Sequence, residues 1–108
     1  MCSLTDMHHR REMAFHTYIA ACHSNTAIYI GVTGDLQKRM HQHASGQGGV
    51  HTSKYRIRKL VYVETYETLP EAIAREAKLK RWRRAWKNEL IKKQNPTWAD
   101  RTLDASFL

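Results

Sequence analysis

The sequence predicts an α+β domain built on a small, mostly antiparallel sheet, and three observations support this class. Two short apolar and aromatic runs, at 14–22 and 27–32, flank the turn residues of HSNT, which is typical of an antiparallel hairpin. A later run, 60–66, is typical of another strand. Helix start signals stand between and after these runs, so the expected order is ββαβαα. A chain of 108 residues can bury one core but not two, and we expect a single domain.

The first expected helix begins near Asp35, which can cap it, and ends near Gly46. The segment 45–58 is rich in glycine and then in basic residues, and we expect it to be a loop.

A second helical pattern opens with Thr68, which can cap, and with Glu71 three residues later and Pro70 in the first turn. The pattern runs to about Lys93, but its apolar stripe changes phase. We therefore expect a break at 81–84 and two helices.

Charged and titratable side chains stand on the core-facing stripe of the first helix. At about 100° per residue, Leu36, Met40 and His43 fall within about 60° of one another, and Arg39 lies beside them. Burying such a group without a partner costs several kcal/mol by rough estimates. Either Arg39 and His43 are buried with partners, or they line a wet cleft.

The later helix aims a carboxylate in the same way. We expect Leu69, Ile73, Ala77 and Leu79 to mark its inward arc, and Glu76 falls within that arc. Burial raises the pKa of a carboxyl unless a cation, from Arg, Lys or a metal, holds it ionised. A structural pair between Glu76 and an arginine is the plain alternative.

Tyr18 and Tyr29 on the expected hairpin complete a set that suits phosphodiester hydrolysis. A carboxylate can hold a divalent cation, and an arginine can neutralise charge on phosphoryl oxygens. A tyrosine or histidine can then manage the protons. Each of these residues also has an ordinary structural role to play, so their convergence is a hypothesis.

The charge of the chain favours a polyanionic partner. The sequence has 18 Lys and Arg against 10 Asp and Glu, a net charge of +8 with a pI near 9.8. A solvated basic surface is the plain alternative. Between Lys78 and Lys93, Trp82 and Trp86 are interleaved with eight basic residues. We expect the indoles to be in the core and the basic side chains to contact phosphate.

Cys2 and Cys22 can form neither a disulfide framework nor a zinc site, and we expect both to be free thiols. No apolar run approaches the roughly 18 residues of a membrane span, and the first twelve residues lack the apolar centre of a signal peptide. We therefore expect a cytoplasmic protein with no membrane partner.

Several ordered motifs resemble those of the GIY-YIG nuclease superfamily, and most closely its small single-domain bacterial branch. HTY is followed by YIG, Arg39 lies ten residues after Tyr29, His43 follows four residues later, and Glu76 is on the later helix. The likeness covers about Phe15 to Trp98 and includes KRM, YRIRKLVYVETYET and EAIAREAKLKRW. It implies a three-stranded antiparallel sheet flanked by helices and metal-dependent cleavage of nucleic-acid phosphodiesters.

The resemblance also implies roles by position. Tyr18 matches the general base, which His43 would help, while Tyr29 and Arg39 match the residues that orient the scissile phosphate. Glu76 matches the ligand of a Mg²⁺ or Mn²⁺ ion. HTY keeps only the tyrosine of the first motif. The family often has an asparagine after the glutamate, and we favour Asn95 over Asn88 for it. The residues expected to bind substrate are Gly31, Lys38, Lys54, Arg56, Lys80, Arg83 and Asn95.

We expect a flexible segment at 1–13, the nuclease domain at 14–98 and a tail at 99–108. The expected function is a magnesium-dependent endonuclease acting on DNA, in repair or recombination. The alternatives are a module that binds nucleic acid without cutting it, and an accessory subunit that docks on a protein partner. Such a partner would supply target specificity. DNA or RNA as substrate, and the oligomeric state, stay open at this point.

Overall fold

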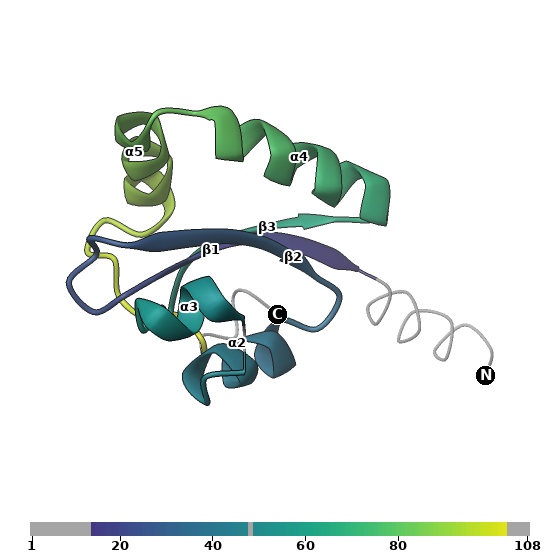
Figure 1. The fold of residues 1–108 in the computed structure, drawn as a ribbon. Helices are drawn as coiled ribbons and strands as arrows, with labels where there is room; N and C mark the ends of the chain where they lie inside the picture. The colour runs from purple at the N-terminus through teal and green to yellow at the C-terminus, as the bar shows by residue number, and fades with distance from the viewer. Residues whose placement is uncertain (1–13, 48, 104–108) are drawn as a thin grey trace.

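The computed structural model describes residues 14–47 and 49–103, and Figure 1 shows how their elements are arranged. A three-stranded antiparallel sheet in the order β2-β1-β3 lies between two layers of helices. The α+β class and the three-stranded sheet expected from the sequence are confirmed. The segment 1–13 and residues 104–108 of the expected tail lie outside the described residues.

The hairpin forms as predicted, from β1 (Phe15–Ala21) and β2 (Ile28–Thr33). Tyr18 pairs with Gly31 across this hairpin. β1 is the central strand because β3 (Lys59–Tyr66) pairs with its other edge. A register shift between Ile19 and Ala20 marks a bulge in that second pairing. The central position buries Thr17 through Ala21 almost completely and gives Tyr18 a fixed backbone.

Each face of the sheet packs against its own pair of helices. On one face lie α2 (Leu36–Ala44) and α3 (Val50–Lys54); on the other lie α4 (Leu69–Arg81) and α5 (Arg84–Gln94) (Figure 1). The first core cluster contains Tyr18, Ala20, Cys22, Leu36, Met40, Ile57, Leu60 and Val63. The second contains Ile19, Ala21, Ile30, Val61, Tyr62, Leu79, Ile91 and Trp98. Alternation along β1 therefore sends Tyr18 toward α2 and its neighbours toward α4.

The predicted helix starts are confirmed by capping hydrogen bonds. Asp35 Oδ1 accepts a hydrogen bond from Lys38 N at 3.1 Å, and the Thr68 side chain accepts one from Glu71 N. The predicted break is also confirmed, because α4 ends at Arg81 and α5 begins at Arg84.

The segment 45–58 is not the uniform loop that we expected, because it contains the short helix α3. Gly49 precedes this helix with φ 128°, a value that glycine adopts without strain. Thr52 is buried and its hydroxyl donates to Gly49 O at 3.3 Å, which closes the turn. Ile57, buried in the first core cluster, then anchors the return to β3.

The buried face of α4 differs from the predicted arc. Ala72 and Leu79 are buried, whereas the other residues of the predicted arc are exposed: Leu69, Ile73 and Ala77. The Thr17 hydroxyl donates to Ala72 O at 2.8 Å, and Ala72 is fully buried. The hydrogen bond from Thr17 therefore helps to set the rotation of α4, which leaves the larger apolar side chains of Leu69 and Ile73 exposed.

The expectation that both indoles lie in the core holds only for Trp82. Trp82 is partly buried against the second core cluster, while Trp86 is 53% exposed and meets Trp82 edge-on at 6.1 Å between ring centroids. Trp82 is the C-cap of α4 and Trp86 lies on α5, so the four-residue spacing is not carried by one helix.

Cys22 is a free thiol, as predicted, while Cys2 lies outside the described residues. Within those residues, no helix has the length and apolar character needed to span a membrane.

Candidate functional site

The site is built around the phenol of Tyr18, which points from the central strand toward α2. Tyr18 is 0% exposed, and its hydroxyl lies 2.8 Å from His43 Nε2. Arg39 Nε donates to the same hydroxyl at 3.2 Å. Three of the residues predicted from the sequence therefore meet at one oxygen atom.

Helix α2 places Arg39 and His43 one turn apart on the side that faces the sheet. Leu36 and Met40 bury the same side of the helix, as the periodicity predicted. Arg39 Nη1 also donates to Gln42 Oε1 at 3.3 Å, so the guanidinium is held from two directions. Of the two alternatives, His43 is buried with Tyr18 as partner, while Arg39 is only partly buried.

Gly31 allows the two tyrosines of the site to lie close together. A Cβ atom at this position would stand 2.7 Å from Tyr18 Oη and 2.8 Å from Tyr29 Cε2. The rings of Tyr18 and Tyr29 have centroids 6.2 Å apart, and Tyr29 meets the His43 ring at 5.4 Å. Gly31 is itself buried, so its contribution is the space that it leaves for these rings.

Burial sets the protonation states of the central pair. It raises the pKa of Tyr18 to about 12, although the hydrogen bond from Arg39 acts in the opposite direction. Burial and the charge of Arg39 lower the pKa of His43 to about 4. At neutral pH the phenol is therefore protonated and the imidazole neutral, so the phenol can donate to His43 Nε2. His43 Nδ1 is buried and has no hydrogen-bond partner among the residues described.

Glu76 approaches from the other layer of helices. Its side chain is 22% exposed, and Oε2 forms an ion pair with Lys80 Nζ at 3.2 Å. The negative charge of Glu76 is a minor contribution to the raised pKa of Tyr18. The structure does not seal this carboxylate in a dry interior.

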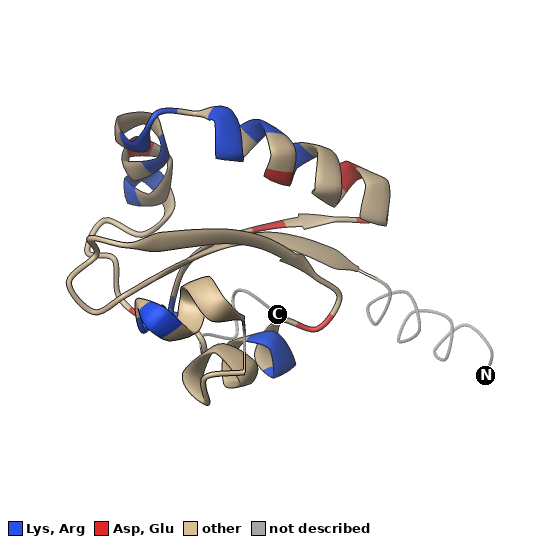
Figure 2. Cartoon of the chain, viewed as in Figure 1, with Lys and Arg blue, Asp and Glu red and all other residues tan. Residues whose placement is uncertain are grey.

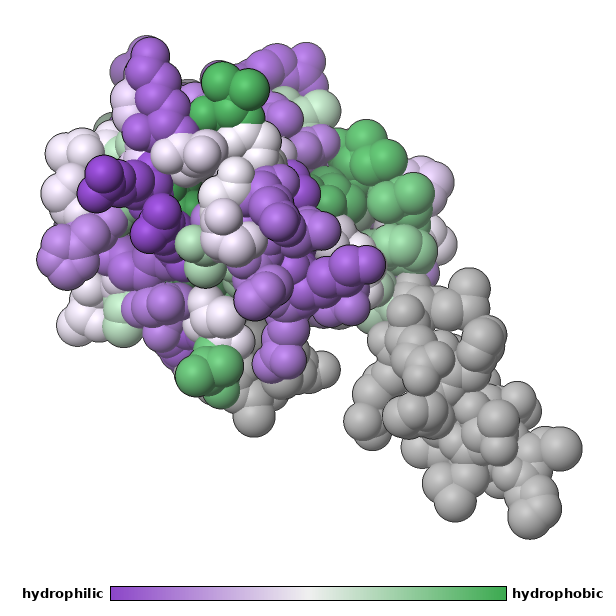
Figure 3. All heavy atoms as spheres, turned by 60° about the horizontal axis from the view of Figure 1, so that its bottom comes forward, coloured by the Kyte–Doolittle hydropathy of each residue, from purple (hydrophilic) through white to green (hydrophobic). Residues whose placement is uncertain are grey.

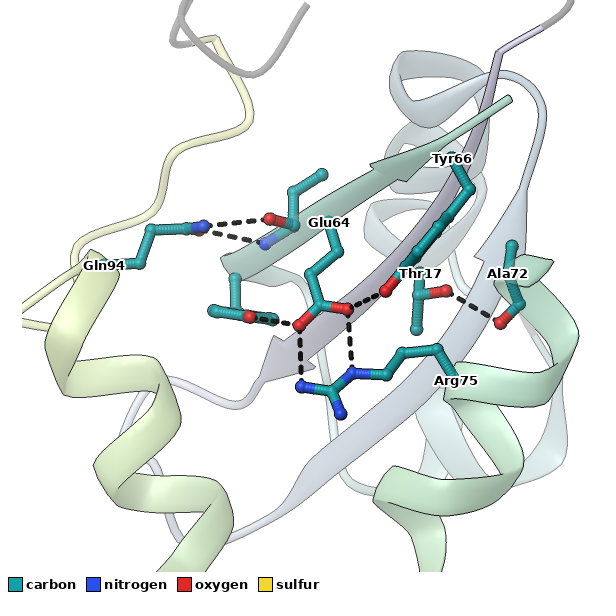
Figure 4. A network of polar contacts seen from close by, with 8 residues as sticks. Thr17, Glu64, Tyr66, Ala72, Arg75 and Gln94 are labelled. Atoms are coloured by element: carbon teal, nitrogen blue, oxygen red, sulfur yellow. Dashed lines mark hydrogen bonds and ion pairs between the residues drawn. The ribbon is translucent and has the colours of Figure 1, made fainter. Parts of the chain in front are cut away.

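A polar network that sequence reasoning missed holds α4 in place (Figure 4). Arg75 Nε and Nη2 donate to the two carboxylate oxygens of Glu64 at 2.9 and 3.0 Å. Tyr66 Oη donates to Glu64 Oε1 at 2.5 Å, and the Tyr62 hydroxyl donates to Oε2. The Arg75 guanidinium holds the pKa of Glu64 below its usual range, with help from both tyrosines and against the effect of burial. A glutamate inside the apolar run of β3 was the available signal.

The same figure shows two more contacts that fix the helices to the sheet. Thr17, one of the two residues of HTY that depart from the family's first motif, donates to Ala72 O. The Gln94 amide donates to Val63 O at 2.9 Å and accepts from Val63 N at 3.0 Å, as a neighbouring strand would. Since Arg75 and Glu76 are adjacent, the network orients the turn of α4 that carries the predicted metal ligand.

The residues expected to bind substrate fall into two groups. Lys38, Lys54, Arg56, Lys80 and Arg83 are exposed, whereas Gly31 and Asn95 are buried. Asn95 Nδ2 donates to Val61 O and Ala99 O, and its Oδ1 accepts from Ala99 N. The structure therefore gives Asn95 a structural role at the end of α5 and does not bring it to the site.

The donor chemistry fits magnesium and not a protein-enclosed metal. In residues 14–47 and 49–103 no three His, Cys, Asp or Glu side chains gather where they could hold a metal ion. Mg²⁺ usually keeps several waters and binds one or two carboxylates together with substrate phosphates. The single carboxylate of Glu76 fits that mode, in which a cation would compete with Lys80 for it.

Comparison with known proteins defines the class. The model of the GIY-YIG catalytic domain matches residues 14–90, and the chain belongs to this family. It is 40% identical over 82 residues to a UPF0213 protein of Syntrophus aciditrophicus, covering 75% of this chain and 92% of that protein. It is 40% identical over 77 residues to a UPF0213 protein of Staphylococcus aureus strain Mu3, covering 71% and 93%.

A solved structure agrees with the fold. The solution NMR structure of a UPF0213 protein from Bacillus halodurans aligns with a TM-score of 0.52 and 27% sequence identity. The alignment covers 86% of this chain and 98% of that one. The chain is thus similar in extent to small proteins of the family, in agreement with the resemblance to its single-domain branch.

Proposed function

We propose that this protein is a metal-dependent endonuclease that hydrolyses phosphodiester bonds in DNA. The observation that carries the proposal is the meeting of Arg39 Nε and His43 Nε2 at the Tyr18 hydroxyl, at 3.2 and 2.8 Å. A buried neutral phenol bonded to a neutral imidazole and a fixed cation is suited to moving a proton beside an anionic group. Membership in the GIY-YIG family supports the same class of reaction.

In this proposal Tyr18 is the general base and His43 its proton acceptor. Tyr18 Oη takes a proton from the attacking water as its own proton passes to His43 Nε2, 2.8 Å away. The low pKa of His43 opposes this transfer, because burial and Arg39 disfavour the imidazolium. A bound phosphodiester would offset the charge of Arg39, so substrate binding would itself favour the transfer.

Arg39 and Tyr29 would bind the scissile phosphate. Arg39 is only partly buried, and the tyrosine hydroxyls of Tyr18 and Tyr29 raise its pKa, so the charge is permanent. A fixed guanidinium stabilises negative charge that develops on phosphoryl oxygens, an effect of roughly 10²–10³ in rate for one such donor. Glu76 would hold Mg²⁺ or Mn²⁺, which when bound stabilises charge on the phosphate and on the leaving 3′ oxygen.

The proposed path of the nucleic acid follows the basic residues outside the site. Figure 2 shows many lysines and arginines on the helices that flank the sheet. Lys38, Lys54, Arg56, Lys80 and Arg83 are the proposed phosphate contacts. A cavity of about 380 Å³ adds Arg58 and Lys59 beside Arg56, and its lining also includes the carboxylate of Asp100. These charges suit a phosphate backbone that extends beyond the scissile bond.

Cleavage assays test the proposal directly. Purified protein is incubated with single-stranded, duplex, nicked and branched DNA in the presence of Mg²⁺ or Mn²⁺. We expect cleavage that is lost in Arg39→Ala and Glu76→Gln and retained in the matched variants Arg101→Ala and Glu67→Gln. Cleavage that survives in both site variants would exclude these residues from catalysis.

A nucleic-acid-binding module without nuclease activity is the second candidate function, favoured by the net charge of +8. Arg39→Ala separates the two. If Arg39→Ala loses cleavage but retains most of the binding, the enzyme is supported. If the wild type does not cleave DNA and Arg39→Ala mainly loses weak, salt-sensitive binding, the module is supported. We further propose a cytoplasmic role in repair or recombination, with a protein partner that supplies target specificity.

A further inference from the structure

Helix α3 brings aromatic side chains next to the site that the proposed reaction does not use. The His51 ring lies 6.4 Å from the Tyr29 ring between centroids, and the Tyr55 ring lies 4.9 Å from His51. Tyr18 and Tyr29 are 6.2 Å apart. A line of rings therefore begins at the catalytic phenol and ends at Tyr55.

Exposure increases along this line. Tyr18 is buried, Tyr29 is half-buried, and His51 and Tyr55 are exposed, with Tyr55 at 47%. Hydrophilic residues dominate the face of the molecule that Figure 3 shows. The two inner rings lie in the proposed catalytic site, while the outer two, His51 and Tyr55, are open to a ligand.

Lys54 adds a positive charge at the outer end. Its ammonium lies over the Tyr55 ring, 5.4 Å from the centroid. Proteins commonly bind single strands through aromatic side chains with a cation beside them. Every base has an aromatic face for stacking, and every nucleotide carries a phosphate that the cation can contact. His51 and Lys54 lie on α3 and Tyr55 is its C-cap, which keeps the two rings and the charge together.

We propose that His51 and Tyr55 form a stacking subsite for the base of the nucleotide next to the scissile phosphate, and that Lys54 contacts the phosphate of that nucleotide. This inference rests on the proposed function and deepens it. A base that is stacked in an intact duplex has no free face to offer, so the substrate must be single-stranded or carry an unpaired nucleotide at this position.

The test measures binding without cleavage. A single-stranded DNA oligonucleotide that carries 2-aminopurine is titrated with protein in EDTA, and the same sequence annealed to its complement serves as the duplex probe. We expect quenching of the 2-aminopurine fluorescence in the single strand and weaker binding of the duplex. Tyr55→Ala should raise the Kd for the single strand by roughly 5- to 150-fold and remove the quenching.

Two further variants separate stacking from folding. Tyr55→Phe keeps the ring and should bind and quench like the wild type. Ile73→Ala removes an exposed apolar side chain from α4, across the sheet, and should change neither value. The inference is overturned if Tyr55→Ala quenches and binds like the wild type, if Tyr55→Phe loses as much as the alanine variant, or if the duplex binds as tightly as the single strand.

The outcomes distinguish this inference from the proposed function. Protein that binds and quenches through Tyr55 but never cuts DNA with Mg²⁺ or Mn²⁺ retains the subsite and refutes the nuclease. Protein that cuts intact duplex with a KM unchanged in Tyr55→Ala retains the nuclease and refutes the subsite. Protein that binds neither probe and cuts no DNA with Mg²⁺ or Mn²⁺ refutes both.

Discussion

Replacing Gly31 with alanine tests whether the two tyrosines of the site are held by close packing. The added Cβ would lie 2.7 Å from Tyr18 Oη, 2.8 Å from Tyr18 Cζ and 2.8 Å from Tyr29 Cε2. Real Cβ contacts essentially never fall below about 3.0 Å, so one of the rings must move. Tyr18 is fully buried and bonded to His43 and Arg39, and a shift of its ring would break that geometry.

We expect Gly31→Ala to lower the free energy of unfolding by about 1–3 kcal/mol, the usual cost of overpacking a core. For a domain of this size this corresponds to a drop in Tm of about 5–20 °C. Cleavage should fall as well, because the Tyr18 hydroxyl loses its position between His43 and Arg39.

Gly34→Ala is the matched control, since its Cβ would meet the Phe15 ring at 3.6 Å, an ordinary contact. Thermal and urea unfolding of the three proteins measures the difference. We expect Gly34→Ala to unfold within about 0.5 kcal/mol of the wild type. A Gly31→Ala protein as stable as the Gly34→Ala protein would refute the packing argument.

Three other predictions concern the site and its support. Because the pKa of His43 is lowered to about 4 by burial, the unfolded chain binds more protons between about pH 4 and pH 6.5. Stability should therefore decrease as the pH is lowered from about 6.5 to about 4, by up to about 3 kcal/mol, and urea unfolding of His43→Gln should show a flatter profile. Thr17→Val removes the hydroxyl that binds α4 and should cost about 1 kcal/mol in the same assay; an unchanged midpoint would contradict this role. Arg56→Gln with Arg58→Gln should weaken DNA binding and reduce the slope of log K against log salt by about 2, whereas Arg101→Gln should leave both values unchanged.

The part of the site that lies on β1 and α2 could be predicted because its sequence signals are local. Asp35 caps α2, and Leu36, Met40 and His43 repeat at helical spacing, so the face that carries Arg39 follows from the sequence. Tyr18 lies on a strand whose alternation decides which layer it faces. A short-range pattern of this kind survives folding unless a tertiary contact opposes it.

The orientation of α4, which carries Glu76, depended on contacts between segments that are distant in the sequence. The rotation of α4 was predicted from Leu69 and Ile73, which are exposed in the structure, because Arg75 pairs with Glu64 on β3 and Ala72 meets Thr17 on β1. Because these partners lie on different elements far apart in the sequence, the periodicity of one helix could not predict their contacts. Glu76, which the apolar pattern placed on the inward arc, is partly buried and pairs with Lys80 of the same helix.

Composition, capping residues and periodicity alone determined the class of fold, the order of the main elements, the break before α5 and the inward face of α2. They did so because backbone hydrogen bonding and burial of apolar side chains act over a few neighbouring residues. Only the tertiary structure decided that α3 forms and brings His51 and Tyr55 beside Tyr29, and that Asn95 serves the fold rather than the site. These outcomes depend on which polar groups from distant parts of the sequence become hydrogen-bond partners once the chain has folded, and only the three-dimensional structure shows which groups lie close enough.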